Sequence, residues 1–94
     1  MRAIIGGLRY DTATATELGS KQYENGTIVA LWRTPQGRYF ITAEGGPPVI
    51  KVGGISYRRE TYYIKALDPD EALDWASCNL DADIVDRIFE VPDA

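Results

Sequence analysis

The sequence contains no histidine and only one cysteine among its 94 residues. Histidine is the commonest general base and metal ligand near neutral pH, so its absence argues against most acid–base and metal chemistry. The cysteine, Cys78, stands among Trp75, Ala76 and Leu80, a setting that predicts a buried structural thiol rather than a nucleophile. A single cysteine cannot form an internal disulfide, which is typical of a reducing cytoplasm. We therefore expect a cytoplasmic protein that is not an enzyme.

Sequence patterns for membranes, metals and cofactors are equally scarce. No apolar run approaches the roughly 20 residues that a membrane helix needs, and Arg9 interrupts an apolar start that is too short for a secretory signal. The glycine pairs lack the lysine and the spacing of nucleotide-binding loops, so they indicate turns and bulges. Asp81, Asp83 and Asp86 lack the glycine and the glutamate of a calcium-binding loop. We expect no cofactor, no metal and no membrane contact.

The length predicts a single domain over residues 1–94, near the lower limit for one hydrophobic core. The clearest local pattern is a β-hairpin, because residues 27–34 and 38–42 are rich in β-branched and aromatic residues and a Pro-Gln-Gly turn joins them. Further strands are predicted at residues 4–5, 8–10, 49–52 and 56–66.

Two helices are predicted near the C-terminus. Asp68, Pro69 and Glu71 have the spacing of an N-cap, a first helical residue and a capping-box partner. The helix that they begin is expected to run to about residue 78. Asp81 is expected to cap a second, shorter helix that Pro92 ends.

A third helix is predicted over residues 12–18, with Asp11 as its N-cap and Gly19 at its end. Together these elements predict an α+β fold: a small twisted antiparallel β-sheet with a short N-terminal helix and two C-terminal helices packed on one face. The side chains predicted to be largely buried are Trp32, Phe40, Trp75, Ile84, Ile88 and Phe89.

Charge is divided unevenly along this chain of net charge −4. Residues 1–66 carry nine Lys and Arg against five acids, whereas residues 67–94 carry nine acids and only Arg87. If the apolar helical residues pack on the sheet, the remaining acids form a negative flank suited to a basic partner surface. The alternative is a solvated acidic face that keeps the protein soluble. The predicted partner-binding acids are Asp70, Glu71, Asp74, Asp83 and Asp86.

A second candidate binding surface is the predicted strand at residues 57–65. Tyrosine and arginine dominate interface hot spots, and aromatic side chains beside cations also suit single-stranded nucleic acid. The alternative is ordinary strand alternation, with Tyr62 and Ile64 facing the core and Tyr63 and Lys65 facing solvent, or the reverse. The candidate partner-binding residues of this strand are Tyr57, Arg58, Arg59 and Tyr63.

The order of several segments is similar to that of a known family. These segments are YDTATA at 10–15, LWRTPQGRYF at 31–40, EGG at 44–46, ALDWA at 72–76 and IF at 88–89. In this order they resemble a family of small proteins carried on phages and other bacterial mobile elements, which includes anti-CRISPR proteins. The similarity covers most of the chain.

The resemblance implies a stoichiometric inhibitor in a bacterial host that binds a subunit of a type I CRISPR-Cas effector complex (Cascade) and blocks target DNA binding. Such complexes hold nucleic acid in basic channels, for which an acidic protein can compete. The positive first two thirds of the chain argue against a whole-molecule DNA mimic and favour a docking domain with one acidic face. Direct DNA binding is not expected.

Two alternatives from other classes remain open. One is a nucleic-acid-binding accessory protein of a mobile element, and the other is a homodimeric regulatory module whose edge strands pair across a two-fold axis. A cluster of cations on one exposed face of the sheet would favour the first alternative. The residues that would form this cluster are Arg33, Arg38, Arg58 and Arg59.

Overall fold

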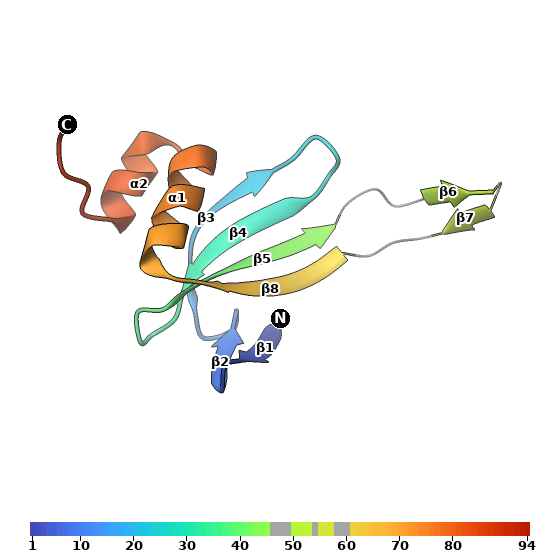
Figure 1. Ribbon diagram of the computed structural model, residues 1–94, viewed down its shortest axis with the longest axis horizontal. Helices are drawn as coiled ribbons and strands as arrows, with labels where there is room; N and C mark the ends of the chain where they lie inside the picture. Colours follow the sequence, from blue (N-terminus) through green and yellow to red (C-terminus); the bar gives the residue numbers. More distant parts are fainter. Residues whose placement is uncertain (46–49, 54, 58–60) are drawn as a thin grey trace.

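The computed structural model describes residues 1–45, 50–53, 55–57 and 61–94. They form antiparallel strands and two helices, which confirms the predicted α+β class (Figure 1). The main sheet has four strands in the order β3-β4-β5-β8. These strands are β3 (Thr16–Gln22), β4 (Ile28–Arg33), β5 (Tyr39–Gly45) and β8 (Thr61–Leu67).

The central hairpin β4–β5 is the one predicted from the sequence. Its register pairs Leu31 with Ile41. The next pair, Trp32 with Phe40, therefore faces the opposite side of the sheet. Gly37 in the connecting turn has a φ of 83°, a conformation that residues with a Cβ rarely adopt. The strand pattern and the turn chemistry thus agree at this hairpin.

The predicted helix over residues 12–18 is wrong. Residues 12–15 form a turn, and β3 begins at Thr16. The Asp11 carboxylate accepts a hydrogen bond from the Ala13 amide at 2.9 Å, and the Ala15 amide donates to the Asp11 carbonyl at 3.0 Å. A single helical turn forms but is not continued, because the residues that follow pair with β4. Asp11 therefore caps a turn rather than a helix.

Gly19, predicted to end that helix, lies inside β3. A bulge interrupts the β3–β4 register between Glu17 and Gly19. A Cβ at Gly19 would lie 2.8 Å from Cδ1 of Leu80, so the missing side chain leaves room for Leu80 to pack directly on the strand.

The N-terminal strands form a hairpin of their own instead of extending the main sheet. They are β1 (Arg2–Ile5) and β2 (Leu8–Asp11). Gly6 and Gly7 both have positive φ, as a two-residue hairpin turn of type I′ requires. The buried Tyr10 ring meets Phe40 edge-on, with the ring centroids 5.5 Å apart. The hairpin therefore covers part of one face of the main sheet.

Two short strands precede β8: β6 (Ile50–Val52) and β7 (Ile55–Tyr57). They pair only with each other in the described part of the chain, and Gly53 between them has a φ of 60°. The single strand predicted over residues 56–66 includes residues 58–60, which lie outside the described residues. Its described parts are both strands, but β7 pairs with β6 whereas β8 pairs with β5. The residue pattern predicts that both segments are strands, but it does not predict that they pair with different strands.

The two C-terminal helices are α1 (Pro69–Asn79) and α2 (Ala82–Ile88). The Asp68 carboxylate accepts from the Glu71 amide at 2.8 Å, and the Glu71 carboxylate accepts from the Asp68 amide at 3.1 Å. These bonds confirm the predicted capping box. Asp81 precedes α2 as predicted, but its side chain makes no capping hydrogen bond. The helix ends before Pro92, at Ile88.

The core lies between these helices and one face of the sheet. Its buried members are Val29, Leu31, Ile41, Ala43, Ala72, Ala76 and Val85. Of the six side chains predicted to be largely buried, Phe40 alone is fully buried and the other five are half-buried. Ala72 and Ala76, both 0% exposed, bring α1 close to the sheet and leave Trp75 on its flank. Cys78, predicted to be buried, is exposed because it lies on the side of α1 away from Ala76.

Candidate functional site

Helix α1 presents a row of carboxylates to solvent. Because Ala72 and Ala76 face the sheet, Asp70 and Asp74, which lie about half a helical turn from these alanines, point outward and are exposed. Glu71 is exposed beside them, with one carboxylate oxygen engaged in the capping box. These three acids stand on a helix whose start is fixed by its own side chains.

Helix α2 has the same arrangement on a shorter scale. Val85 packs into the core cluster, while Asp83 and Asp86 are exposed and lie one turn apart. Just beyond the helix, the Phe89 ring packs against Tyr39 of the sheet with the ring centroids 5.4 Å apart. Val85 and Phe89 together attach α2 to the same side of the sheet as α1.

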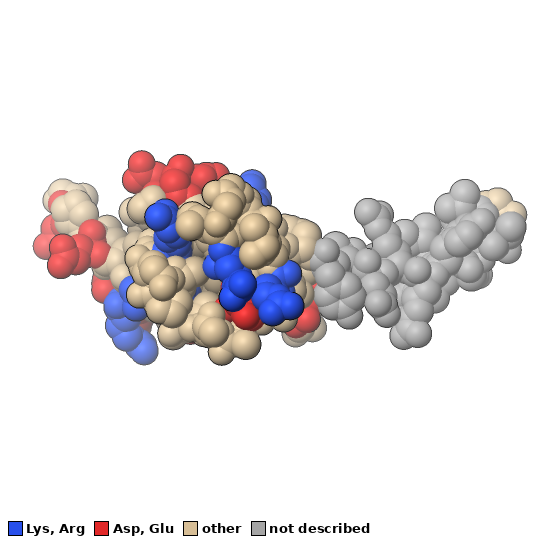
Figure 2. All heavy atoms as spheres, turned by 90° about the horizontal axis from the view of Figure 1, so that it is seen from below, with Lys and Arg blue, Asp and Glu red and all other residues tan. Residues whose placement is uncertain are grey.

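We call the exposed acids of the two helices the acidic helical layer, and each of them is exposed to solvent as the sequence predicted. They are Asp70, Glu71, Asp74, Asp83 and Asp86. The two helices contact each other, and Arg87 is the only Lys or Arg in residues 67–94. In Figure 2 the red carboxylates gather over the helical end, whereas most blue side chains lie over the strands and the N-terminal hairpin.

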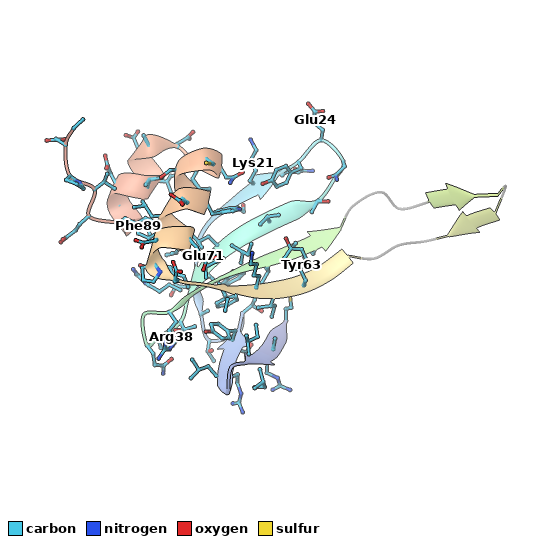
Figure 3. The ribbon with its side chains drawn as sticks, viewed as in Figure 1. Lys21, Glu24, Arg38, Tyr63, Glu71 and Phe89 are labelled. Atoms are coloured by element: carbon cyan, nitrogen blue, oxygen red, sulfur yellow. The ribbon has the colours of Figure 1, made fainter. Side chains whose placement is uncertain are left out.

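The second predicted surface falls largely outside the residues that the structure describes. Tyr57 belongs to β7, where the structure describes the backbone alone, and Arg58 and Arg59 lie outside the described residues. Tyr63 lies in β8 and is 45% exposed (Figure 3). Its register partner in β5 is Ala43, a core residue, so Tyr63 stands on the helix-covered face of the sheet. Tyr63 is therefore the one member of the predicted set whose side chain the structure describes, and it lies at the surface.

Of the four arginines of the predicted cluster, the structure describes Arg33 and Arg38, whereas Arg58 and Arg59 lie outside the described residues. Arg33 is half-buried at the end of β4, and Arg38 is exposed in the turn before β5 (Figure 3). Sequence reasoning missed two other exposed cations, Arg2 and Arg9, on the outer face of the N-terminal hairpin. Successive side chains of a strand point to opposite faces, so an inward-facing Tyr10 could have predicted that these two arginines face outward.

An apolar pocket of 220 Å³ opens between α1, α2 and the C-terminal segment. Its lining residues are Ser77, Leu80, Ala82, Val85, Asp86 and Val91. Sequence reasoning missed this pocket because its walls come from three segments whose relative placement depends on the packing of the helices. A hydrophobic residue shortly after the last helix, Val91, was the only local signal.

Searches for other kinds of site and for similar proteins gave negative results. In the described ranges, no helix is long and apolar enough to cross a membrane. Among the same residues, no group of three or more acidic, cysteine or histidine side chains is arranged to hold a metal ion. The chain matches no protein-family model, no curated protein and no solved structure.

Proposed function

We propose that this protein is a non-catalytic inhibitor whose acidic helical layer docks on a basic, nucleic-acid-binding surface of another protein. The proposed partner is a subunit of a type I CRISPR-Cas effector complex, which then fails to capture target DNA. One observation carries the proposal: five exposed carboxylates stand on two contacting helices, and Arg87 is the only Lys or Arg in residues 67–94.

The electrostatic argument depends on the five carboxylates acting together. A surface that binds nucleic acid presents Lys and Arg side chains to a row of phosphates. Carboxylates on a helical surface can meet the same cations, but each exposed pair contributes only about 0–1 kcal/mol. Several such pairs accelerate encounter and fix the orientation of docking, and they weaken as salt rises.

The scaffold holds the layer in place before any partner arrives. The capping box fixes the first turn of α1. At its other end, the Tyr23 hydroxyl donates to Asn79 Oδ1 at 2.8 Å, and the Asn79 side-chain amide donates to the Trp75 carbonyl at 2.8 Å. Such preorganisation lowers the entropy that is lost on binding.

A binding role without catalysis is supported by the side chains at hand. The chain has no histidine. Cys78 is exposed on α1 one turn after Asp74, whereas reactive cysteines are found in electropositive surroundings. A layer dominated by carboxylates provides charge complementarity for a basic surface.

The proposal is tested by titrating the protein into a purified type I effector complex and measuring the anisotropy of a labelled target duplex. Duplex binding is expected to be lost near one protein per binding site, with weaker inhibition at higher salt. Duplex binding by the protein alone would instead establish the nucleic-acid-binding alternative. An effector complex that captures duplex normally at saturating protein contradicts the proposal. Sedimentation of the protein alone tests the homodimer alternative.

A further inference from the structure

The pocket between α1, α2 and the C-terminal segment differs from its acidic surroundings. Leu80, Ala82, Val85 and Val91 make most of its lining apolar. The Ser77 hydroxyl donates a hydrogen bond to the Leu73 carbonyl at 2.7 Å. Asp86 is the one charged residue in the lining. An apolar hollow inside a charged layer is suited to an anchor side chain.

The pocket walls are held by contacts elsewhere in the fold. Leu80 packs on the bare backbone of Gly19, and its amide donates to the Ala76 carbonyl at 2.8 Å. Val85 belongs to the core cluster. Val91, by contrast, is 45% exposed and forms the open side. The hollow is therefore preformed on two sides and accessible on the third.

The size of the pocket limits what it can hold. A volume of 220 Å³ lies below the about 300–1,000 Å³ of typical small-molecule sites. It is adequate for one aliphatic side chain, whose burial supplies affinity that exposed charge pairs do not.

The charges around the pocket define the chemistry of the segment that carries that side chain. Asp86 lies in the lining, Asp83 is one turn before it on α2, and Asp74 is one turn before Ser77 on α1. Arg87 is the only Lys or Arg of residues 67–94. The surroundings are thus net acidic, which favours Lys or Arg on either side of the anchor.

We infer that this pocket receives one leucine-sized side chain from a basic segment of the partner protein. The inference rests on the proposed function and adds an apolar centre to its electrostatic surface. A fully desolvated anchor at the centre of charged contacts is the usual arrangement of an interface hot spot. The acidic layer then attracts and orients the segment, while the pocket slows its dissociation.

The test uses two short peptides as probes, one with leucine and one with serine between flanking lysines, titrated into protein with isotope-labelled Val and Leu methyl groups. The leucine peptide is expected to bind about tenfold more tightly and to shift the methyl signals of Val85 and Val91. Equal affinity for the two peptides overturns the pocket inference but leaves the electrostatic proposal intact. No salt-sensitive binding of either peptide contradicts both.

A filling variant separates the pocket from general effects on folding. Ala82→Leu places a larger side chain at an exposed lining position and is expected to abolish the leucine preference while lysine-dependent binding persists. Ala13→Leu, in an exposed turn of the N-terminal region, is the matched control. If Ala82→Leu fails to fold, Val91→Ser provides the second test, with the same loss expected. Methyl shifts that depend on protein concentration without peptide would show a second copy in the pocket and overturn the inference.

Discussion

The two faces of the four-stranded sheet are covered by layers of different construction and charge. On one face, α1 and α2 bury Leu31 and Ile41 beneath alanine contacts and turn carboxylates outward. On the other face, the β1–β2 hairpin makes its main described aromatic contact through Tyr10 and turns Arg2 and Arg9 outward. The helical layer is therefore part of the core, whereas the hairpin is a smaller attachment.

This difference separates stability from binding. The residues of α1 that face the sheet, Ala72 and Ala76, are small and apolar, and they lie on the opposite side of the helix from Asp70 and Asp74. Carboxylates can therefore be exchanged without disturbing the core. The helical segment over residues 67–94 is acidic whereas the hairpin carries Arg2 and Arg9, so a basic partner surface is attracted more strongly to the helical layer than to the hairpin.

The largest effect on stability is expected at the centre of the helical face. Leu31 is 0% exposed, and Leu31→Ala should lower the free energy of unfolding by about 2–5 kcal/mol because it leaves a cavity beneath α1. Urea denaturation followed by circular dichroism measures this change. A loss below that of Tyr10→Ala would show that the hairpin, and not the helical layer, dominates the core.

A smaller and more local effect is expected on the hairpin face. Tyr10→Ala should cost about 1.5–3 kcal/mol through lost burial against Phe40. Hydrogen exchange should accelerate in β1 and β2 while the amides of α1 keep their protection. Equal acceleration in α1 would refute the separation of the two layers.

The cap of α1 is expected to contribute less. Asp68→Ala removes the acceptor for the Glu71 amide and should cost about 1 kcal/mol. For a domain of this size, that loss corresponds to a fall in melting temperature of about 4–8 °C. Asp68→Asn, which keeps an acceptor, is the control and should melt close to the parent.

The smallest effect is expected at the exposed thiol. Cys78→Ser should change stability by less than about 0.5 kcal/mol and leave inhibition intact, because the side chain is exposed and the proposed function is not catalytic. Because it is exposed, Cys78 should also be modified by a thiol reagent in the folded parent, without unfolding. Loss of inhibition in a variant of unchanged stability would point to chemistry at the sulfur.

Features that depend on interactions between residues close in sequence were predicted correctly. The hairpin over β4 and β5 and the capping box at Asp68 and Glu71 depend on nearby residues, and both were predicted. The exposure of the acids was also predicted, since apolar spacing on a helix implies which side chains face solvent.

The errors arose where distant contacts decide between local alternatives. The hydrogen bond from Ala13 to Asp11 is compatible with either a helix cap or a turn, and pairing with β4 selected the turn. The exposure of Trp75 depends on how closely Ala72 and Ala76 approach the sheet. The pocket depends on where Val91 lies relative to both helices, which no local pattern specifies.

The central claim, that the acidic helical layer binds a basic partner surface, is tested most directly by calorimetry of two matched charge reversals against the same purified type I effector complex. One variant is Asp70→Lys with Asp74→Lys, which leaves the capping Glu71 in place. The other is Arg2→Glu with Arg9→Glu on the opposite layer. With both variants folded, the account predicts a loss of binding of at least about tenfold for the first and little change for the second. Unchanged binding by the first variant, or the larger loss in the second, would contradict it.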